Sequence, residues 1–173
     1  MNIHEIRDLS NHHVLDILRN GLSSLNPLEP NYSPELSNQS SNLFYLLENG
    51  RYADGCYYVV EDNGKYVASA GWNRYDKDTA IVLSRAYVSK SHRTTYVMAS
   101  LLLPRMLEQC KDYEKVWITC NEHNKAIYNW FVRTNQGKRP AMFSNWPEIY
   151  SNFEPIGKKI IYYTEQFVVQ LKR

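Results

Sequence analysis

Hydrophobic residues recur along the first fifty positions in patterns that predict one short strand and two helices. Ile3, Ile6 and Leu9 frame an opening segment that is typical of a strand. Ser10 can cap the helix that follows, and Gly21 marks its end. The apolar positions of that helix keep the i, i+3, i+4 spacing of one helical face: Val14, Leu15, Ile17, Leu18 and Leu22. A loop rich in Pro, Asn and Ser covers 26–41, and 43–47 predicts a short second helix.

The middle of the chain has the clearest strand pattern. Residues 56–60 and 66–70 are rich in Tyr, Val and Ala, and Asp62-Asn63-Gly64 lies between them. Asn-Gly between two such runs is a strong hairpin signal, because both residues tolerate a positive φ. A third run, 80–88, predicts another strand.

The second half alternates between helical and strand patterns. Apolar positions at Met98, Leu101, Leu102, Met106 and Cys110 predict a helix, which Pro104 should kink or shorten. Residues 115–120 predict a strand and 121–133 a helix. Residues 158–163 and 166–171 predict two closing strands, joined by Thr164-Glu165.

These elements predict one α/β domain over 1–173, with a mixed sheet and helices on both faces. Residues 1–50 hold the N-terminal strand and helices, and 56–171 hold the core of the domain. The sequence has no internal repeat and no low-complexity tract.

Charge is divided unevenly between the two halves of the chain. The net charge is +2, yet residues 1–79 hold 6 Lys/Arg against 11 Asp/Glu, and residues 80–173 hold 14 against 7. The second half should therefore attract an anionic ligand if it contains a site, although ordinary surface scatter would look the same.

The expected location is a reducing cytoplasm. Cys56, Cys110 and Cys120 are odd in number and lack CxxC spacing, which argues against a disulfide framework. No leader pattern opens the chain, and no apolar run approaches the length of a membrane span. The histidines lack the spacing of zinc ligands, so no metal is expected.

The segment from Val88 to Met98 is the most informative for function. It joins a strand to the start of a helix, where free backbone N–H groups can bind phosphate. Lys90, His92 and Arg93 add positive or potentially positive charge. A plain strand-to-helix turn with solvated basic residues is the alternative.

This segment resembles the central motif of the GNAT superfamily of acyl-CoA-dependent N-acyltransferases. That motif has Val at the strand end, Arg five residues later, and the loop R-G-x-G-x-G/A opening a helix; Val88 and Arg93 keep the spacing. The order of elements over 56–171 also fits, including Asn124-Lys-Ala-Ile127 and the closing Gln166-Phe-Val168. The resemblance implies a mostly antiparallel sheet splayed at its centre.

The resemblance further implies that acetyl-CoA is the cosubstrate, that no metal takes part, and that the acceptor is an amine of a small molecule or protein. A homodimer is left open, and neither nucleic acid nor membrane is an expected partner. The implied contacts to coenzyme A come from the strand end, the loop and the next helix start: Ala86, Tyr87, Val88, Arg93, Thr94, Thr95, Tyr96, Val97, Met98 and Asn124.

Two departures from the family pattern leave a second function open. Thr94, Tyr96 and Met98 stand where the motif has glycine or alanine. The usual tyrosine general acid is replaced by Trp130 or Phe131, which makes Tyr128 the available proton donor in that helix. The alternative is therefore a catalytically inactive domain of the same fold that serves in protein contact.

Other candidate sites carry less weight. Cys120 and His123 could form a nucleophilic pair, but a buried cysteine is the preferred interpretation. The aromatic stretch Phe143, Trp146, Tyr150 and Phe153 is either a packed connection or a wall of a substrate pocket.

Overall fold

The computed structural model describes residues 1–10, 45–89, 91–92, 97–138 and 147–173. The helix predicted after Ser10 and the loop over 26–41 lie outside these residues. Residues 45–48 are helical and overlap the predicted second helix, 43–47, whose first two residues lie outside the described ones. None of the described helices is long and apolar enough to cross a membrane.

The N-terminal half builds four neighbouring strands. They are β1 (Asn2–Ile6), β2 (Gly55–Asp62), β3 (Lys65–Arg74) and β4 (Thr79–Val88), each antiparallel to the next. The predicted hairpin is confirmed: Asn63 and Gly64 have φ of 50° and 75° and connect β2 to β3. Positive φ at both residues matches the right-handed twist of the flanking strands.

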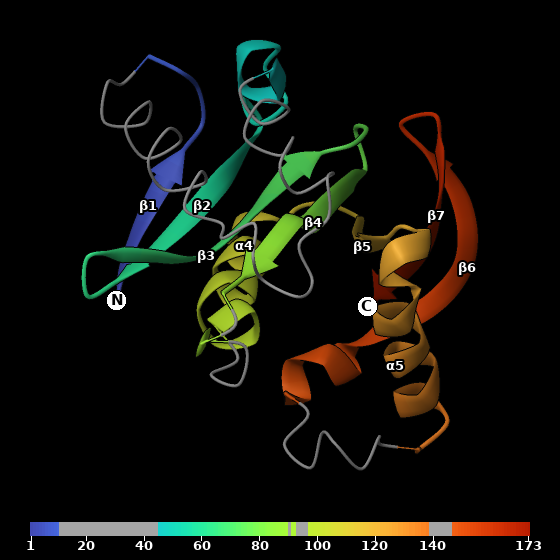
Figure 1. Ribbon diagram of the computed structural model, residues 1–173. Coiled ribbons are helices and arrows are strands. Elements are labelled where there is room, and N and C mark those ends of the chain that lie inside the picture. The colour runs from blue at the N-terminus through green and yellow to red at the C-terminus, as the bar shows by residue number, and fades with distance from the viewer. Residues whose placement is uncertain (11–44, 90, 93–96, 139–146) are drawn as a thin grey trace.

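The C-terminal half completes a mixed sheet. Its strands are β5 (Lys115–Cys120), β6 (Phe153–Ile161) and β7 (Thr164–Leu171). The seven described strands follow the order β1-β2-β3-β4-β5-β7-β6, in which only β4 and β5 pair in parallel (Figure 1). The mixed, mostly antiparallel sheet is therefore confirmed.

The connection from β4 to β5 is helical. A π-helical stretch, η4 (Met98–Leu102), leads directly into α4 (Leu103–Gln109). Pro104 lies in the first turn of α4, where its missing N–H costs least, and the α-helix proper is shortened as predicted. At the other end, the Gln109 side-chain oxygen accepts hydrogen bonds from Tyr58 and from Trp72 Nε1, the latter at 2.6 Å, which ties α4 to β2 and β3.

Short helices follow β5. A 3-10 turn, η5 (Glu122–Asn124), precedes α5 (Lys125–Asn135), and a second 3-10 turn, η7 (Glu148–Asn152), precedes β6. Tyr150 and Phe153 pack edge-to-face on Phe131 of α5, so this part of the aromatic stretch is a packed connection. Phe143 and Trp146 lie outside the described residues.

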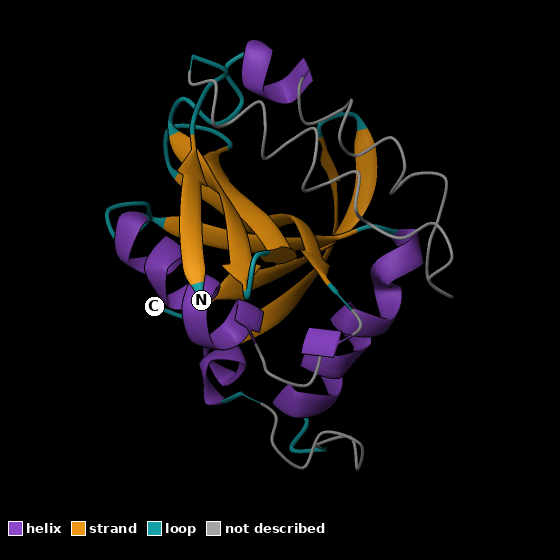
Figure 2. Cartoon of the chain, turned by 60° about the vertical axis from the view of Figure 1, so that its left-hand side comes forward, coloured by secondary structure: helices purple, strands orange, loops and turns teal. Residues whose placement is uncertain are grey.

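Helices cover both faces of the sheet, as predicted. The face that includes Cys56, Tyr58 and Val60 packs against η4, α4 and α5 and forms the main core. The opposite face, which includes Tyr57 and Val59, packs against Leu46 and Leu47 of the short helix. Figure 2 shows this short helix above the sheet and the other helices below it. We call the side of the sheet that packs against α4 the α4 face, and the opposite side the Tyr57 face.

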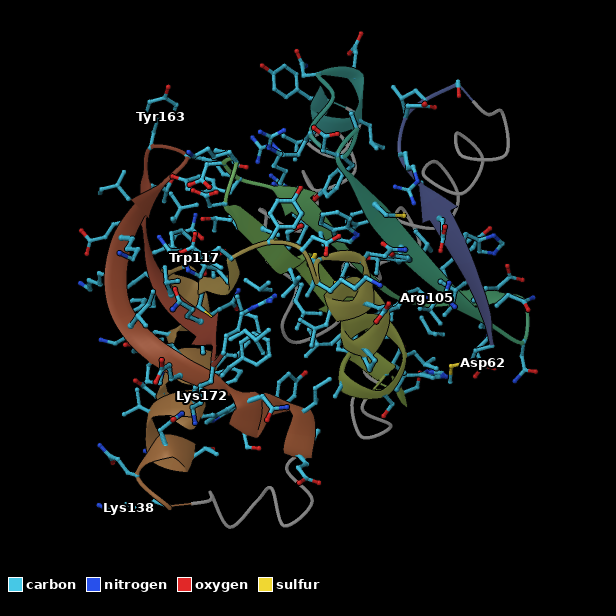
Figure 3. The ribbon with its side chains drawn as sticks, turned by 180° about the vertical axis from the view of Figure 1, so that it is seen from behind. Asp62, Arg105, Trp117, Lys138, Tyr163 and Lys172 are labelled. Atoms are coloured by element: carbon cyan, nitrogen blue, oxygen red, sulfur yellow. The ribbon has the colours of Figure 1, made fainter. Side chains whose placement is uncertain are left out.

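The turn between the last two strands differs from the prediction. The sequence suggested Thr164-Glu165, but the turn is formed by Tyr162 and Tyr163, with φ of 47° and 68°, and Ile161 pairs with Thr164. Figure 3 shows Tyr163 at the tip of this hairpin. A two-residue turn with two positive φ values normally contains Asn or Gly, so Tyr-Tyr gives no sequence signal for it.

Candidate active site

The two central strands separate partway along their length. β4 and β5 pair from Thr79 with Lys115 to Val82 with Ile118, and the register ends there. β4 nevertheless continues to Val88 along β3, and β5 continues to Cys120 along β7. The sheet is thus splayed at its centre. We call this region, where β4 runs on from residue 83 to 88 beyond its pairing with β5, the β4–β5 gap.

The backbone of β4 becomes irregular where the gap begins. Leu83 and Arg85 have φ of 54° and 51°, an uncommon conformation for residues other than glycine, and the register with β3 shifts on both sides of Gly71. The Leu83 N–H leaves the β-ladder and donates a hydrogen bond to Met106 Sδ at 3.4 Å. We call residues 83–85 the β4 bulge; bulges of this kind redirect side chains and end strand pairing.

The predicted strand-end residues border the gap. Tyr87 pairs with Ser69 and Val88 with Ala68, so the strand is regular again after the bulge. The Ser89 N–H donates to Val67 O, and amide directions alternate along an antiparallel strand. The N–H groups of Ala86 and Val88 are therefore turned away from β3, toward the β4–β5 gap.

Only part of the predicted phosphate loop is described. Arg93, Thr94, Thr95 and Tyr96 lie outside the described residues. Val97 and Met98 are the first described residues of the helical segment, and both side chains are buried in the main core. Val97 provides no side-chain cap for the helix start. The two residues therefore point their side chains inward, so Met98 does not occupy space outside the helix start despite replacing a small residue.

Asn124 lies at the start of α5, beyond the end of β5. Its backbone N–H donates to the Asn121 side-chain oxygen at 3.0 Å, and its own side chain is exposed and makes no cap hydrogen bond. The structure thus places it at the same end of β5 as the gap, with an amide side chain directed to solvent.

Tyr128 is one turn further along α5. Its ring packs against Phe167 of β7, with centroids 5.1 Å apart, and Phe167 pairs with Cys120 at the end of β5. Among the described residues none forms a hydrogen bond with the Tyr128 hydroxyl. Tyr128 therefore lies at the β5 side of the gap, whereas Ala86 and Val88 lie at the β4 side.

Comparison with known proteins decides the family. The sequence profile of the acetyltransferase (GNAT) family matches residues 22–135. This chain belongs to the GNAT family. Members of the family in general transfer an acetyl group from acetyl-CoA to an amine acceptor. No curated protein sequence matches the chain significantly.

Solved structures share the GNAT fold at low sequence identity. A GNAT-family protein from Desulfovibrio desulfuricans superimposes with a TM-score of 0.58 at 10% identity, covering 99% of both chains. A GNAT-family acetyltransferase from Staphylococcus aureus Mu50 gives 0.57 at 13% identity, covering 99% of this chain and 100% of that one. An acyl-CoA N-acyltransferase from Pseudomonas aeruginosa gives 0.55 at 11% identity, covering 99% of both. At these identities the likeness concerns the fold.

The cysteines of this GNAT domain are structural. Burial raises the pKa of Cys120 to about 11 and that of Cys110 to about 12, so both thiols stay protonated at neutral pH. A protonated thiol is a poor nucleophile, which favours the buried-cysteine interpretation over a Cys120–His123 pair. Among the described residues, no group of three or more His, Cys, Asp or Glu side chains could hold a metal ion.

Sequence reasoning missed a polar aromatic cluster on the Tyr57 face of the GNAT domain. The Tyr52 hydroxyl and Ser84 Oγ form a hydrogen bond of 3.0 Å, and Ser84 Oγ donates to Gly71 O at 3.1 Å. The Tyr57 hydroxyl donates to Ser69 Oγ at 3.0 Å and to Arg85 O at 3.3 Å. Burial raises the pKa of Tyr52, so its hydroxyl stays protonated. These hydrogen bonds hold the β4 bulge in place from the Tyr57 face.

The same cluster continues to the β6–β7 turn. Asn73 Nδ2 donates to the Tyr162 hydroxyl at 2.9 Å, and Tyr75 packs edge-to-face on the Tyr162 ring with centroids 5.1 Å apart. The Arg51 guanidinium carbon lies 3.7 Å from the Tyr162 ring centroid. None of these residues belongs to a sequence motif, and only the fold brings them together. The positive φ of Leu83, Arg85 and Tyr162 likewise has no sequence signature.

Proposed function

We propose that this chain transfers an acetyl group directly from acetyl-CoA to the primary amine of a small molecule or protein, in the cytoplasm. The observation that carries the proposal is the β4–β5 gap, which opens at Val82 and Ile118 directly after the parallel pairing. An extended pantetheine arm would lie between β4 and β5 in this gap. Membership in the GNAT family supports the same assignment, and the free state of all three cysteines suits the location.

The β4 side of the gap would bind and polarise the thioester. In this proposal the amides of Ala86 and Val88, with Tyr87 between them, face the acetyl group and donate to its carbonyl oxygen. That oxygen gains negative charge as the amine attacks. A preorganised donor of this kind is typically worth about 3–4 kcal/mol of transition-state stabilisation.

The start of the helical segment would hold the pyrophosphate. Val97 and Met98 lie next to the predicted loop, and because both side chains are buried, they would leave the space outside the helix open for the pyrophosphate. Arg93, Thr94, Thr95 and Tyr96 complete the proposed loop. Asn124 would hydrogen-bond to the pantetheine arm from the start of α5. The residues that the structure describes thus fit coenzyme A.

The chemistry requires one bond to form and one to break. The neutral amine nitrogen attacks the carbonyl carbon, so a C–N bond forms while the C–S bond breaks. The products are the N-acetylated amine and coenzyme A. The amine loses its proton to water, and the departing sulfur takes one up. We assign that second transfer to the Tyr128 hydroxyl, which solvent then reprotonates.

The proposal is tested by binding and turnover together. Acetyl-CoA at 100 times its dissociation constant should stabilise the fold by about 2.7 kcal/mol, which thermal unfolding would show. Release of free coenzyme A thiol, together with the mass of the product, should then report transfer to amines. Stabilisation without transfer to any amine in a broad panel, or no stabilisation at all, would favour the inactive binding domain.

A further inference from the structure

Two arginines lie near Tyr52, beside the β4 bulge on the Tyr57 face. Arg85 is part of the bulge, and Arg51 follows the short helix and stacks on Tyr162 at 3.7 Å. Both positive charges act on the Tyr52 phenol, where they lower its pKa against the larger, opposite effect of burial. Arg85 acts in the same direction on Tyr57. The two guanidinium groups therefore share one neighbour, the Tyr52 hydroxyl.

Neither arginine is neutralised by the described part of the chain. Within those residues no carboxylate lies within salt-bridge distance of Arg51 or Arg85, although Arg74 and Arg105 have such partners in Asp54 and Glu5. Both arginines are also half-buried, which partly removes their hydration. Two half-buried guanidinium groups without an acidic partner in the described ranges are costly unless an anion binds there.

The position of these arginines matches the route that the acceptor needs. In the proposed reaction coenzyme A approaches from the starts of η4 and α5, whose residues pack on the α4 face. Since the pantetheine arm would fill the gap from that side, the amine must reach the carbonyl from the opposite side of the sheet. Arg85 lies on that side, directly next to the gap, and its backbone oxygen accepts from Tyr57 of the same face.

Backbone strain is concentrated at the same place. Leu83, Arg85 and Tyr162 have positive φ, which costs roughly 1–2 kcal/mol for a residue other than glycine. The buried Asn73 and the Tyr75 ring hold Tyr162 in that conformation. Strain of this kind gathers at ligand-binding positions, where surrounding contacts impose it.

We propose that the acceptor is a free amino acid, whose carboxylate is bound by Arg51 and Arg85 while its amine faces the β4–β5 gap. This inference rests on the proposed function and names its substrate class. A planar guanidinium binds a carboxylate through two parallel hydrogen bonds, so the pair fixes both the charge and the orientation of the acceptor. The half-buried Tyr162 ring, on which Arg51 stacks, forms one wall of the proposed site.

The test compares acceptors that differ only in the carboxylate. Amino acids, their C-terminal amides and the matching amines without a carboxyl group are assayed at fixed acetyl-CoA. The amino acid should exceed its amide at least about tenfold in kcat/KM, the ratio that corresponds to about 1.4 kcal/mol. Short peptides with an acidic residue and amino sugar phosphates complete the panel. Equal rates for amino acid and amide, or a preference for the phosphates or peptides, would overturn the inference while leaving N-acetyl transfer intact.

Variants of the two arginines test whether they cause the preference for a carboxylate. Arg51→Gln and Arg85→Gln should each raise the KM for the amino acid about tenfold or more, with the KM for acetyl-CoA and the rate on the amide unchanged. Arg51→Lys and Arg85→Lys should restore part of the binding, because they keep the charge without the planar fork. Arg105→Gln on α4 removes the same charge from an exposed ion pair and should change none of these values (Figure 3). A KM that is unaffected by Arg51→Gln and Arg85→Gln would overturn the inference.

Equilibrium binding separates this inference from the proposed function. Calorimetry with an amino acid and coenzyme A, but no acetyl group, measures the carboxylate site without turnover. Binding that is lost in folded Arg51→Gln and Arg85→Gln would support the inference even if no transfer occurs. Absence of amino acid binding in the parent protein would overturn it even if other amines are acetylated. Thermal unfolding of each variant excludes misfolding as the cause.

Discussion

The ring of Tyr128 on α5 packs against the ring of Phe167 on β7, with centroids 5.1 Å apart. Because Phe167 pairs with Cys120, this contact holds Tyr128 at the end of β5, where the central strands have separated. Tyr128→Phe keeps the ring and its packing and removes only the hydroxyl. If Tyr128 is the general acid, turnover should fall by at least about tenfold, within the range that proton donation contributes. Stopped assays of coenzyme A release would measure the loss.

Tyr163→Phe is the matched control for this change. Its side chain is fully exposed at the hairpin tip, so the same loss of a hydroxyl should leave turnover unchanged. Acetyl-CoA binding should be equal in the parent and both variants. Equal turnover in Tyr128→Phe would show that water or another group protonates the leaving sulfur.

The hydroxyl of Tyr52 stabilises the β4 bulge through Ser84. Tyr52→Phe removes the 3.0 Å hydrogen bond but leaves Ser84 Oγ its bond to Gly71 O, so no buried group loses every partner. We expect a loss of about 1 kcal/mol in the free energy of unfolding. Urea unfolding measures it, again with Tyr163→Phe as reference. A change no larger than that of the reference would mean that the bulge is held by other contacts.

Gly71 allows two tyrosine rings to pack against β3. A Cβ at this position would lie 2.6 Å from Tyr52 Cε1 and 2.8 Å from Tyr57 Cδ2, both closer than atoms can approach. Gly71→Ala should therefore destabilise the fold by about 1–3 kcal/mol, the usual cost of overpacking. In a Tyr52→Leu background, where Cε1 is absent, the same change should cost at least about 0.5 kcal/mol less. Additive effects in this double-mutant cycle would rule out the ring contact as the cause.

Burial of Cys120 predicts a pH dependence of stability. The native state raises the pKa of this thiol from 9.0 to about 11, so it holds its proton at a pH where the unfolded chain has lost it. The contribution of the protonated thiol to the free energy of unfolding is therefore complete below about pH 9 and is lost as the pH rises toward 11. The difference in unfolding free energy between the parent and Cys120→Ala should narrow by about 1–2 kcal/mol between neutral pH and pH 10.5. A constant difference would contradict the assigned burial.

Most of the described helices, strands and turns could be predicted, because short stretches of sequence specify them. Asn63-Gly64 specified the β2–β3 turn, since both residues adopt positive φ at little cost. The apolar run at 115–120 corresponds to β5 residue for residue. Pro104 shortened the α-helix before β5, because it lacks the N–H that an interior helical residue donates. The family motif from Val88 onward predicts that this strand borders the proposed coenzyme A site.

The tertiary structure decided where the chain departs from regular geometry. Nothing in Tyr162-Tyr163 indicates a turn, and the turn was predicted two residues too late. That conformation is held by Asn73, Tyr75 and Arg51, which approach only after the sheet has formed. The β4 bulge arises in the same way, through Tyr52 and Tyr57 on neighbouring elements. The sequence by itself thus determined the elements and the family, whereas packing between distant segments determined the bulge and the arginine pair beside it. The physical reason is that a strained backbone is stable only where several distant side chains hold it.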